Sequence, residues 1–441
     1  MAVGRLNFFK SFFARMAELV DALVSGTSVR TYVQVRVLFR APQASFQEAF
    51  FLPELPASSL LFLLLSSYSM PVDYLPEGCV KECRGCGHRL MTMQESLIRK
   101  KTFLQSKLSA WGDLIEDVRS VPASGRLGYR DKVNLAMKWT GTKWETGTLN
   151  REDLISIPDC PVHKQTVNEV IRLFHSALPG YSEIQAVRYV QTAKQVAIVV
   201  KSRELPDTGW LTETIAKRLA SIGIEGVWLH LFPSSGKKVF GKGGWHLIRG
   251  KESSQDESGL WYGPAAFQQL LPVLANQALD TAYEFLMPDA NSAVIEMYCG
   301  TGSGLKKWTQ AGAKALGIEI SAEALRMAAM NAPRAETFTG TCRQRLPQME
   351  KWLNGIEDGF TRLLYVNPPR TGMEDGIAEW IASFMKPIRM AYLSCSAGTL
   401  SRDLSILCKS GYSVDRIIPF DFFPQTIHVE SLVLLKKADC I

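Results

Sequence analysis

The chain has 441 residues, of which 46% are hydrophobic, and a formal net charge of +7. This length predicts two or three domains, and the hydrophobic share is ample for packed cores, which argues against a disordered chain. The mild basic excess is compatible with a nucleic-acid partner without requiring one. Nine cysteines without a convincing secretory signal favour metal-binding or catalytic roles over a disulfide scaffold.

The first 69 residues differ in composition from the rest of the chain. They hold few charges, and their apolar run at 60–65 is shorter than the ~20 residues that a membrane span needs. Residues 16–28 look like the peptide obtained when a tRNA gene is translated. We therefore expect residues 1–69 to be a non-native extension and the protein to open at Met70; the alternative is a membrane-associating or disordered extension. We expect no membrane partner and a cytoplasmic location.

Three cysteines follow within eight residues, at Cys79, Cys83 and Cys86. A fourth ligand is available in Cys160, which precedes a proline that fixes the loop around it. Four thiolates hold either a [4Fe–4S] cluster or a zinc ion. Since no histidine lies at zinc-finger spacing, we expect the cluster; zinc and unligated thiols remain alternatives that spacing alone does not separate.

The middle of the chain is expected to contain both helices and strands. Helical periodicity covers 91–118, and 128–139 alternates polar and apolar residues as a half-buried strand does. A basic strand of this kind beside an aromatic residue is able to contact RNA. A further helix at 167–177 and strands near 186–190 and 195–200 are expected. The polar stretch 251–259 indicates a domain junction.

An apolar strand from Val294 runs into a glycine-rich turn that begins at Gly300. A second short strand ends in Glu319, at about the spacing at which a carboxylate reaches ribose hydroxyls. This pair predicts a Rossmann-like α/β domain that binds a nucleoside-bearing cofactor. No phosphate-binding Gly-Lys-Ser/Thr follows, and the motifs downstream suit methyl transfer, so S-adenosylmethionine fits better than NAD.

The most informative residue is Cys395, which follows an apolar strand at 388–393 and precedes a helix start. A thiol at the carboxyl end of such a strand lies where open α/β sheets do their chemistry, and a nearby helix N-terminus favours its thiolate. Another strand ends in Asn367-Pro-Pro-Arg370, which resembles the loop of amino-methyltransferases except that Arg370 replaces the stacking aromatic residue. Glu430, just before a strand at 432–435, is the candidate base.

These segments, in this order from Cys79 to Leu435, resemble the RNA uracil-C5 methyltransferase family. The resemblance implies a class I, Rossmann-like methyltransferase domain at 251–441. It further implies a central α+β domain at 126–250 and an iron–sulfur segment with a helix at 70–125. By the same resemblance, Cys395 is the nucleophile and Glu430 the general base, and the cluster ligands are Cys79, Cys83, Cys86 and Cys160. The residues implied in donor binding are Gln269, Tyr298, Gly300, Glu319 and Asn367.

The implied reaction transfers a methyl group from S-adenosylmethionine to C5 of a uridine through a covalent Cys–C6 adduct. Asn367 and the absence of a TRAM-like β-barrel pattern make the chain look most similar to the 23S ribosomal RNA branch that lacks this domain. A tRNA uridine methyltransferase is the first alternative. A non-catalytic iron–sulfur RNA-binding protein is the second, since Leu271 and Thr341 depart from the family pattern. We expect a monomer.

Overall fold

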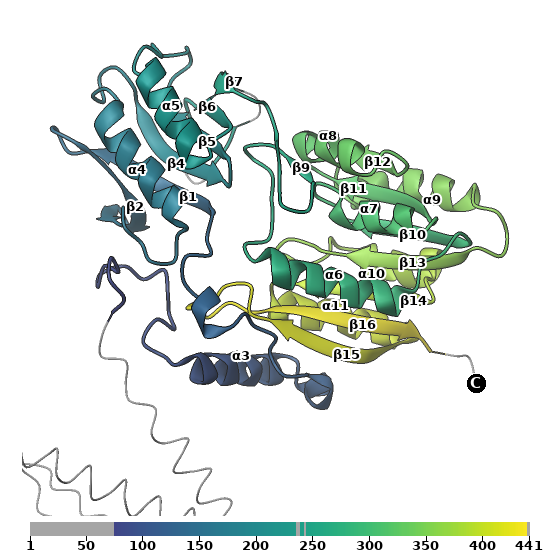
Figure 1. The fold of residues 1–441 in the computed structure, drawn as a ribbon. Helices are drawn as coiled ribbons and strands as arrows, with labels where there is room; N and C mark the ends of the chain where they lie inside the picture. The colour runs from purple at the N-terminus through teal and green to yellow at the C-terminus, as the bar shows by residue number, and fades with distance from the viewer. Residues whose placement is uncertain (1–74, 235–238, 242–243, 439–441) are drawn as a thin grey trace, which may run out of the picture. The chain divides into compact units, whose positions relative to one another are not determined.

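The structure is a computed structural model that describes residues 75–441, apart from 235–238, 242–243 and 439–441. The expectations for residues 1–69 therefore lie outside the described residues. Within the described part, the strands form two seven-stranded sheets and a two-stranded ribbon (Figure 1). We call the sheet of β1–β7 the central sheet and the sheet of β10–β16 the C-terminal sheet.

The central sheet has the strand order β3-β2-β1-β4-β5-β6-β7, and all its neighbours are antiparallel except β5 and β6. Helices α4 and α5 pack beside each other against it (Figure 1). Alternate residues of β1, among them Val133 and Leu135, lie in the core that these helices cover. The bounds are β1 Lys132–Trp139, β2 Trp144–Asn150, β3 Asp153–Ser156, α4 Gln165–Ala177, β4 Ala186–Thr192, β5 Gln195–Val200, α5 Glu213–Ile222, β6 Gly226–Leu231 and β7 Trp245–Gly250. The strands predicted near 186–190 and 195–200 are confirmed as β4 and β5, whereas β1 begins later than expected because 128–131 pairs with the loop at 161–164 instead.

The C-terminal sheet has the order β12-β11-β10-β13-β14-β16-β15. Its first five strands are parallel, and β16 lies antiparallel between β14 and β15. The ribbon of β8 (Ser254–Gln255) and β9 (Trp261–Tyr262) precedes it. The bounds are α6 Pro272–Leu286, β10 Ser292–Met297, α7 Ser303–Gln310, β11 Lys314–Glu319, α8 Ala322–Asn331, β12 Glu336–Thr339, α9 Leu346–Asn354, β13 Thr361–Val366, α10 Ile377–Trp380, β14 Arg389–Ser394, α11 Ala397–Lys409, β15 Tyr412–Phe420 and β16 Glu430–Lys437.

Helices cover both faces of the C-terminal sheet, and two apolar cores lie between them and the strands (Figure 1). All six residues of β10 are buried, as is typical of a parallel strand covered on both faces. Chain order reverses at β10, because β11 lies on one side of it and β13 on the other. Open α/β sheets bind their ligands at such a switch point, beyond the carboxyl ends of the strands. The predicted Rossmann-like α/β fold is confirmed.

The segment before the central sheet packs against the C-terminal sheet. Helix α3 (Met93–Lys107) begins with a capping box in which Thr92 and Glu95 exchange hydrogen bonds. It continues into a 3₁₀ turn at Ser109–Leu114, and Leu104, Leu108 and Ile115 join the core of the C-terminal sheet. The main chain at Ile115 and Arg119 then pairs with the edge strand β15. The chain therefore passes along this sheet before it builds the central one. No described helix is long and apolar enough to cross a membrane.

Candidate active site

A cavity of about 1010 Å³ lies at the carboxyl ends of β10, β11, β13 and β14. Residues from the loops of the central sheet, among them Asp131 and Lys194, complete its wall. All seven residues predicted for donor binding and catalysis line this one cavity: Gln269, Tyr298, Gly300, Glu319, Asn367, Cys395 and Glu430. The structure thus brings together residues that are up to 161 positions apart in the sequence, as the contact between Gln269 and Glu430 illustrates.

The glycine-rich turn after β10 depends on left-handed backbone conformations. Tyr298 has φ 61°, and Gly300 and Gly302 have φ 53° and 81°. A Cβ at Gly302 would lie 2.9 Å from the Cβ of Ala328 on α8, closer than side chains pack. The turn therefore needs glycine both for its conformation and for the close approach of α7 and α8.

Glu319, the last residue of β11, is tied to this turn. One carboxylate oxygen accepts a hydrogen bond from the Gly300 amide at 3.1 Å, and the other accepts from the Ser321 amide at 2.9 Å. Each oxygen retains a second lone pair, and the residue lines the cavity. In the same cavity, the buried Oε1 of Gln269 has no hydrogen-bond partner among the described residues. Acceptors of this kind fit a ligand that carries hydroxyl and amino groups, as S-adenosylmethionine does.

The register of two neighbouring strands places Cys395 beside Glu430. Strands β14 and β16 are antiparallel, and Ser394 is paired with Ser431. One step further along the same register, Cys395 meets Glu430, since the one follows β14 and the other begins β16. The nucleophile and the base predicted from sequence therefore lie close enough at the cavity wall for the charge of Glu430 to act on the Cys395 thiol.

Burial changes the acidity of both groups. It raises the pKa of the Glu430 carboxyl to about 7, while a hydrogen bond from Gln269 Nε2 (3.2 Å) and the charge of Arg370 act in the opposite direction. Burial and the neighbouring Glu430 also raise the pKa of the Cys395 thiol, against which Arg370 again acts. The sequence suggested that the helix N-terminus would favour the thiolate; in the structure, burial outweighs such help.

Two residues at the cavity were not assigned a role from sequence. Arg370 was noted only as a departure from an aromatic residue, yet its charge acts on both Cys395 and Glu430. Glu374 follows β13, and its carboxylate accepts hydrogen bonds from the amides of Cys342 (3.1 Å) and Arg343 (2.9 Å). Glu374 thereby places a carboxylate beside the segment that follows β12, and that segment has no acidic residue of its own. Only the tertiary structure reveals this placement.

Lys132 lies on the basic strand that, from its sequence, is able to contact RNA, but its side chain contacts protein groups. Its ammonium group lies 5.3 Å from the centre of the Phe267 ring and 3.5 Å from the Gln268 carbonyl oxygen. Burial lowers its pKa to about 7. The Lys132 side chain thus makes its contacts within the protein, with the two residues before Gln269, and it supports the loop that carries Gln269.

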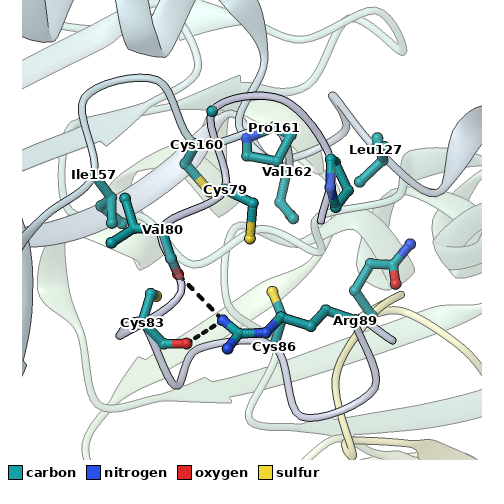
Figure 2. A pocket seen from close by; sticks show the side chains of 13 residues that line it. Cys79, Val80, Cys83, Cys86, Arg89, Leu127, Ile157, Cys160, Pro161 and Val162 are labelled. Carbon is teal, nitrogen blue, oxygen red and sulfur yellow. Dashed lines mark hydrogen bonds between the residues drawn. The ribbon is translucent and has the colours of Figure 1, made fainter. Parts of the chain in front are cut away.

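The four predicted cluster cysteines line one small apolar pocket, together with Ile157, Pro161 and Val162 (Figure 2). Arg89 stabilises the loop by donating to the carbonyls of Val80 (3.3 Å), Lys81 (2.7 Å) and Cys83. Burial and the other thiols raise the pKa of Cys86 to about 11, so a bound cation would be needed to hold it as a thiolate. No group of three or more His, Cys, Asp or Glu side chains in the described part of the chain is arranged to hold a metal ion. The thiols converge, but the expected metal site is not seen.

The chain is similar to RNA-modifying enzymes over most of its length. The family model described as tRNA (Uracil-5-)-methyltransferase matches residues 262–438. An uncharacterized RNA methyltransferase of Clostridium acetobutylicum is 27% identical, over 81% of this chain and 82% of its own. The 23S rRNA (uracil(1939)-C(5))-methyltransferase RlmD of Pseudomonas fluorescens is also 27% identical, over 82% of this chain and 81% of its own.

A solved structure is similar to this chain over about the same share of its length as these relatives. The tRNA (uracil-54, C5)-methyltransferase of Pyrococcus abyssi, in complex with S-adenosyl-L-homocysteine, superposes with a TM-score of 0.59 and 21% identity. The match covers 80% of this chain and 86% of that one. At this identity the likeness supports the fold.

Proposed function

We propose that the chain is an RNA uracil-C5 methyltransferase, like the relatives that it matches, and that it transfers a methyl group from S-adenosylmethionine to C5 of a uridine, with 23S ribosomal RNA as the substrate. The observation that carries the proposal is that Cys395 and Glu430 lie near each other at the wall of a cavity that the donor-type residues also line. A thiol and a carboxylate in this arrangement suit covalent catalysis on a poorly nucleophilic carbon.

The residues of the chain account for each step of the reaction. The Cys395 thiolate adds to C6 of the uracil, and the electron pair of the C5–C6 bond becomes an enolate with a nucleophilic C5. This carbon forms a bond to the methyl group as the bond to the donor sulfur breaks. Glu430 then removes the C5 proton, the double bond re-forms, and Cys395 leaves as a thiolate. A positioned base contributes about 10²- to 10⁴-fold to such a step.

The donor residues fit S-adenosylmethionine, which supplies the methyl group when bound. Glu319 would accept hydrogen bonds from ribose hydroxyls, since the amides of Gly300 and Ser321 hold its two oxygens in place. The unpartnered Oε1 of Gln269 would accept from the donor or the substrate. Tyr298, Gly300 and Asn367 would line the remaining wall. The target uridine has to leave its stack to reach Cys395, and that exchange selects unpaired or weakly stacked positions.

We assign the four converging thiols to a [4Fe–4S] cluster. The pocket is apolar and its ligand set is entirely sulfur, which is the donor chemistry that such clusters take. A cluster spreads its four ligands over more space than a single ion does, so a pocket between the thiols suits it better than zinc. Cys79, Cys83, Cys86 and Cys160 would be the ligands.

Similarity to a 23S rRNA enzyme over four fifths of both chains favours ribosomal RNA. A tRNA substrate is the second candidate, because the family model and the superposed structure carry that name. A non-catalytic RNA-binding protein is the third, and the paired Cys395 and Glu430 argue against it.

The test is methyl transfer from labelled donor to total RNA, followed by mapping of the modified base. We expect label at C5 of a uridine in 23S RNA, and no label or covalent RNA adduct with Cys395→Ala. Label confined to tRNA would support the second candidate. If the wild-type protein binds the donor tightly but transfers nothing, the catalytic proposal is wrong.

A further inference from the structure

The loop at 421–429 joins β15 to β16 and ends directly at Glu430. Phe423 and His428 of this loop also line the active-site cavity, and their rings meet edge to face with centres 6.0 Å apart. The position of the loop therefore sets the position of the proposed base and of one wall of the substrate pocket.

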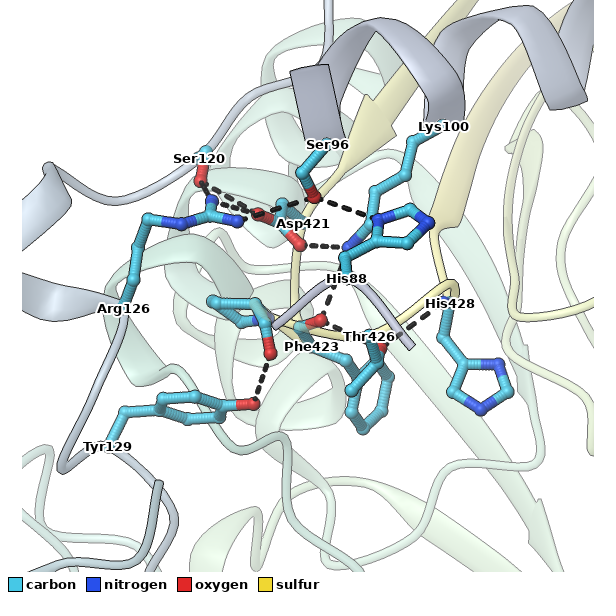
Figure 3. A network of polar contacts seen from close by, with 11 residues as sticks. His88, Ser96, Lys100, Ser120, Arg126, Tyr129, Asp421, Phe423, Thr426 and His428 are labelled. Carbon is cyan, nitrogen blue, oxygen red and sulfur yellow. Dashed lines mark hydrogen bonds and ion pairs between the residues drawn. The ribbon is translucent and has the colours of Figure 1, made fainter. Parts of the chain in front are cut away.

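Asp421, the first residue of the loop, is fully buried and sits between two cations (Figure 3). Its carboxylate forms ion pairs with Lys100 and, at 2.6 Å, with Arg126, and it accepts a hydrogen bond from Ser120 Oγ at 3.0 Å. Lys100 also donates to the Phe423 carbonyl at 3.2 Å. These partners come from α3 and from the segment at 115–129, so the loop is held from outside its own sheet.

The cysteine-bearing segment holds the middle of the same loop. The His88 amide, two residues after Cys86, donates to the Gln425 carbonyl at 2.8 Å. Gly87 packs so closely that a Cβ there would lie 2.9 Å from Ile427 Cγ2. Gln425, with φ 67°, is itself part of the wall of the four-cysteine pocket.

Two further contacts connect these attachments. The Tyr129 hydroxyl donates to the Pro424 carbonyl at 3.0 Å, and His88 Nδ1 lies 2.9 Å from Ser96 Oγ, which also contacts Arg126 (Figure 3). The segment that carries His88, helix α3 and the segment at 115–129 are thus linked to one another as well as to the loop at 421–429. A buried charge network of this kind is specific in geometry, because losing one partner leaves the others unpaired.

We infer that Asp421 and the segment at 79–88 are positioning elements for Glu430, so that the four-cysteine site serves the reaction by holding the loop that carries the base. This inference rests on the proposed function. It assigns no chemical step to the cysteine site. It predicts that disturbing either attachment slows release of the covalent adduct while leaving its formation by Cys395 largely intact, since Cys395 lies between β14 and α11, outside the network.

The first experiment compares Asp421→Asn with Asp415→Asn, which breaks an exposed ion pair with Lys436 on neighbouring strands. In Asp421→Asn we expect adduct release to slow by about 10²-fold, as small misplacements of catalytic groups do. Amide hydrogen exchange in a peptide covering 421–430 should accelerate, and Asp415→Asn should match the wild type in both measurements. A folded Asp421→Asn with wild-type release and exchange overturns the inference.

Tyr129→Phe provides a milder variant if Asp421→Asn does not fold, because it removes only the hydrogen bond to Pro424. It should change release and exchange in the same direction by a smaller factor, and unchanged values would count against the inference.

The second experiment addresses the cysteine site without relying on turnover. Cys86→Ala, and wild-type protein treated with an iron chelator, should both show faster exchange in the 421–430 peptide than untreated protein. Unchanged exchange in both would separate the cysteine site from the loop and overturn that half of the inference. If the wild type forms no adduct at all, the proposed function fails, while the exchange comparison still tests the attachment.

Discussion

The burial of Cys395 and Glu430 disfavours the ionised forms that the proposed reaction requires of both residues. The nucleophile acts as a thiolate and the base as a carboxylate, yet the pKa of each group is raised. The charge of Glu430 also disfavours the Cys395 thiolate, since the two residues lie near each other at the cavity wall. Arg370 is the cation that opposes both shifts. The balance between these three residues should therefore govern the pH dependence of the reaction.

Glu430→Gln should separate the two halves of the reaction. The variant retains the hydrogen-bonding shape of the side chain, so the adduct should still form, but its release should slow by about 10²- to 10⁴-fold. In the wild type, release should increase as pH rises through about 7, the pKa at which Glu430 becomes ionised, and this increase should be lost in the variant. Single-turnover kinetics with isolated adduct measure both; normal release by Glu430→Gln would exclude Glu430 as the base.

Arg370→Met removes the positive charge that lowers both pKa values. We expect the midpoint of the release profile to move to higher pH and adduct formation to slow at neutral pH, because less thiolate is present. Arg370→Lys, which keeps the charge, is the matched control. Identical pH profiles for the wild type and Arg370→Met would show that this cation does not act on the pair.

At the scale of elements, the turn between β10 and α7 combines strained backbone with close packing. Gly302→Ala should weaken donor binding, because its methyl group would overlap Ala328 and displace the turn that Glu319 anchors. Gly359→Ala is the control: its φ is 92°, but a Cβ there meets nothing within 4 Å. Both substitutions carry a conformational cost of about 1–2 kcal/mol. Calorimetric titration with S-adenosylmethionine should find weaker binding only in Gly302→Ala; equal affinities would contradict a role of the turn in donor binding.

The order of elements also explains why the C-terminal half was easier to predict than the segment before it. Parallel strands such as β10 are mostly apolar and fully buried, and the glycine turn and the acidic residue that follow such strands mark the cofactor edge. The periodicity at 91–118 predicted a helix, and α3 confirms its first part, since the helix ends at Lys107 and a 3₁₀ turn follows at Ser109–Leu114. Nothing in that periodicity revealed which sheet the helix contacts. Its buried Lys100 resembles an exposed basic residue in sequence, whereas in the structure it pairs with Asp421.

At the scale of the whole molecule, the four thiols connect segments that are distant in sequence. Cys160 follows the strands β1–β3, while the other three cysteines precede α3. Because a bound cluster contributes its binding free energy to folding, Cys160→Ser should lose iron and lower the melting temperature. Anaerobic purification, iron analysis and thermal unfolding test this, with Cys408→Ser as the control, since Cys408 on α11 lies outside the pocket. Equal iron content in Cys160→Ser and the wild type would remove Cys160 from the ligand set.

The sequence by itself determined the α/β fold, the glycine turn with its acid, the four cysteines, and Cys395 and Glu430 as candidates, because periodicity, turn residues and local spacing are properties of short segments. The tertiary structure decided which of these meet. The antiparallel insertion of β16 beside β14 placed the acid next to the thiol, and the packing of α3 and the segment after it against that sheet placed Lys100 and Arg126 around Asp421. Contacts between such distant residues depend on strand order and on where helices pack, and both arise from packing between segments far apart in the chain.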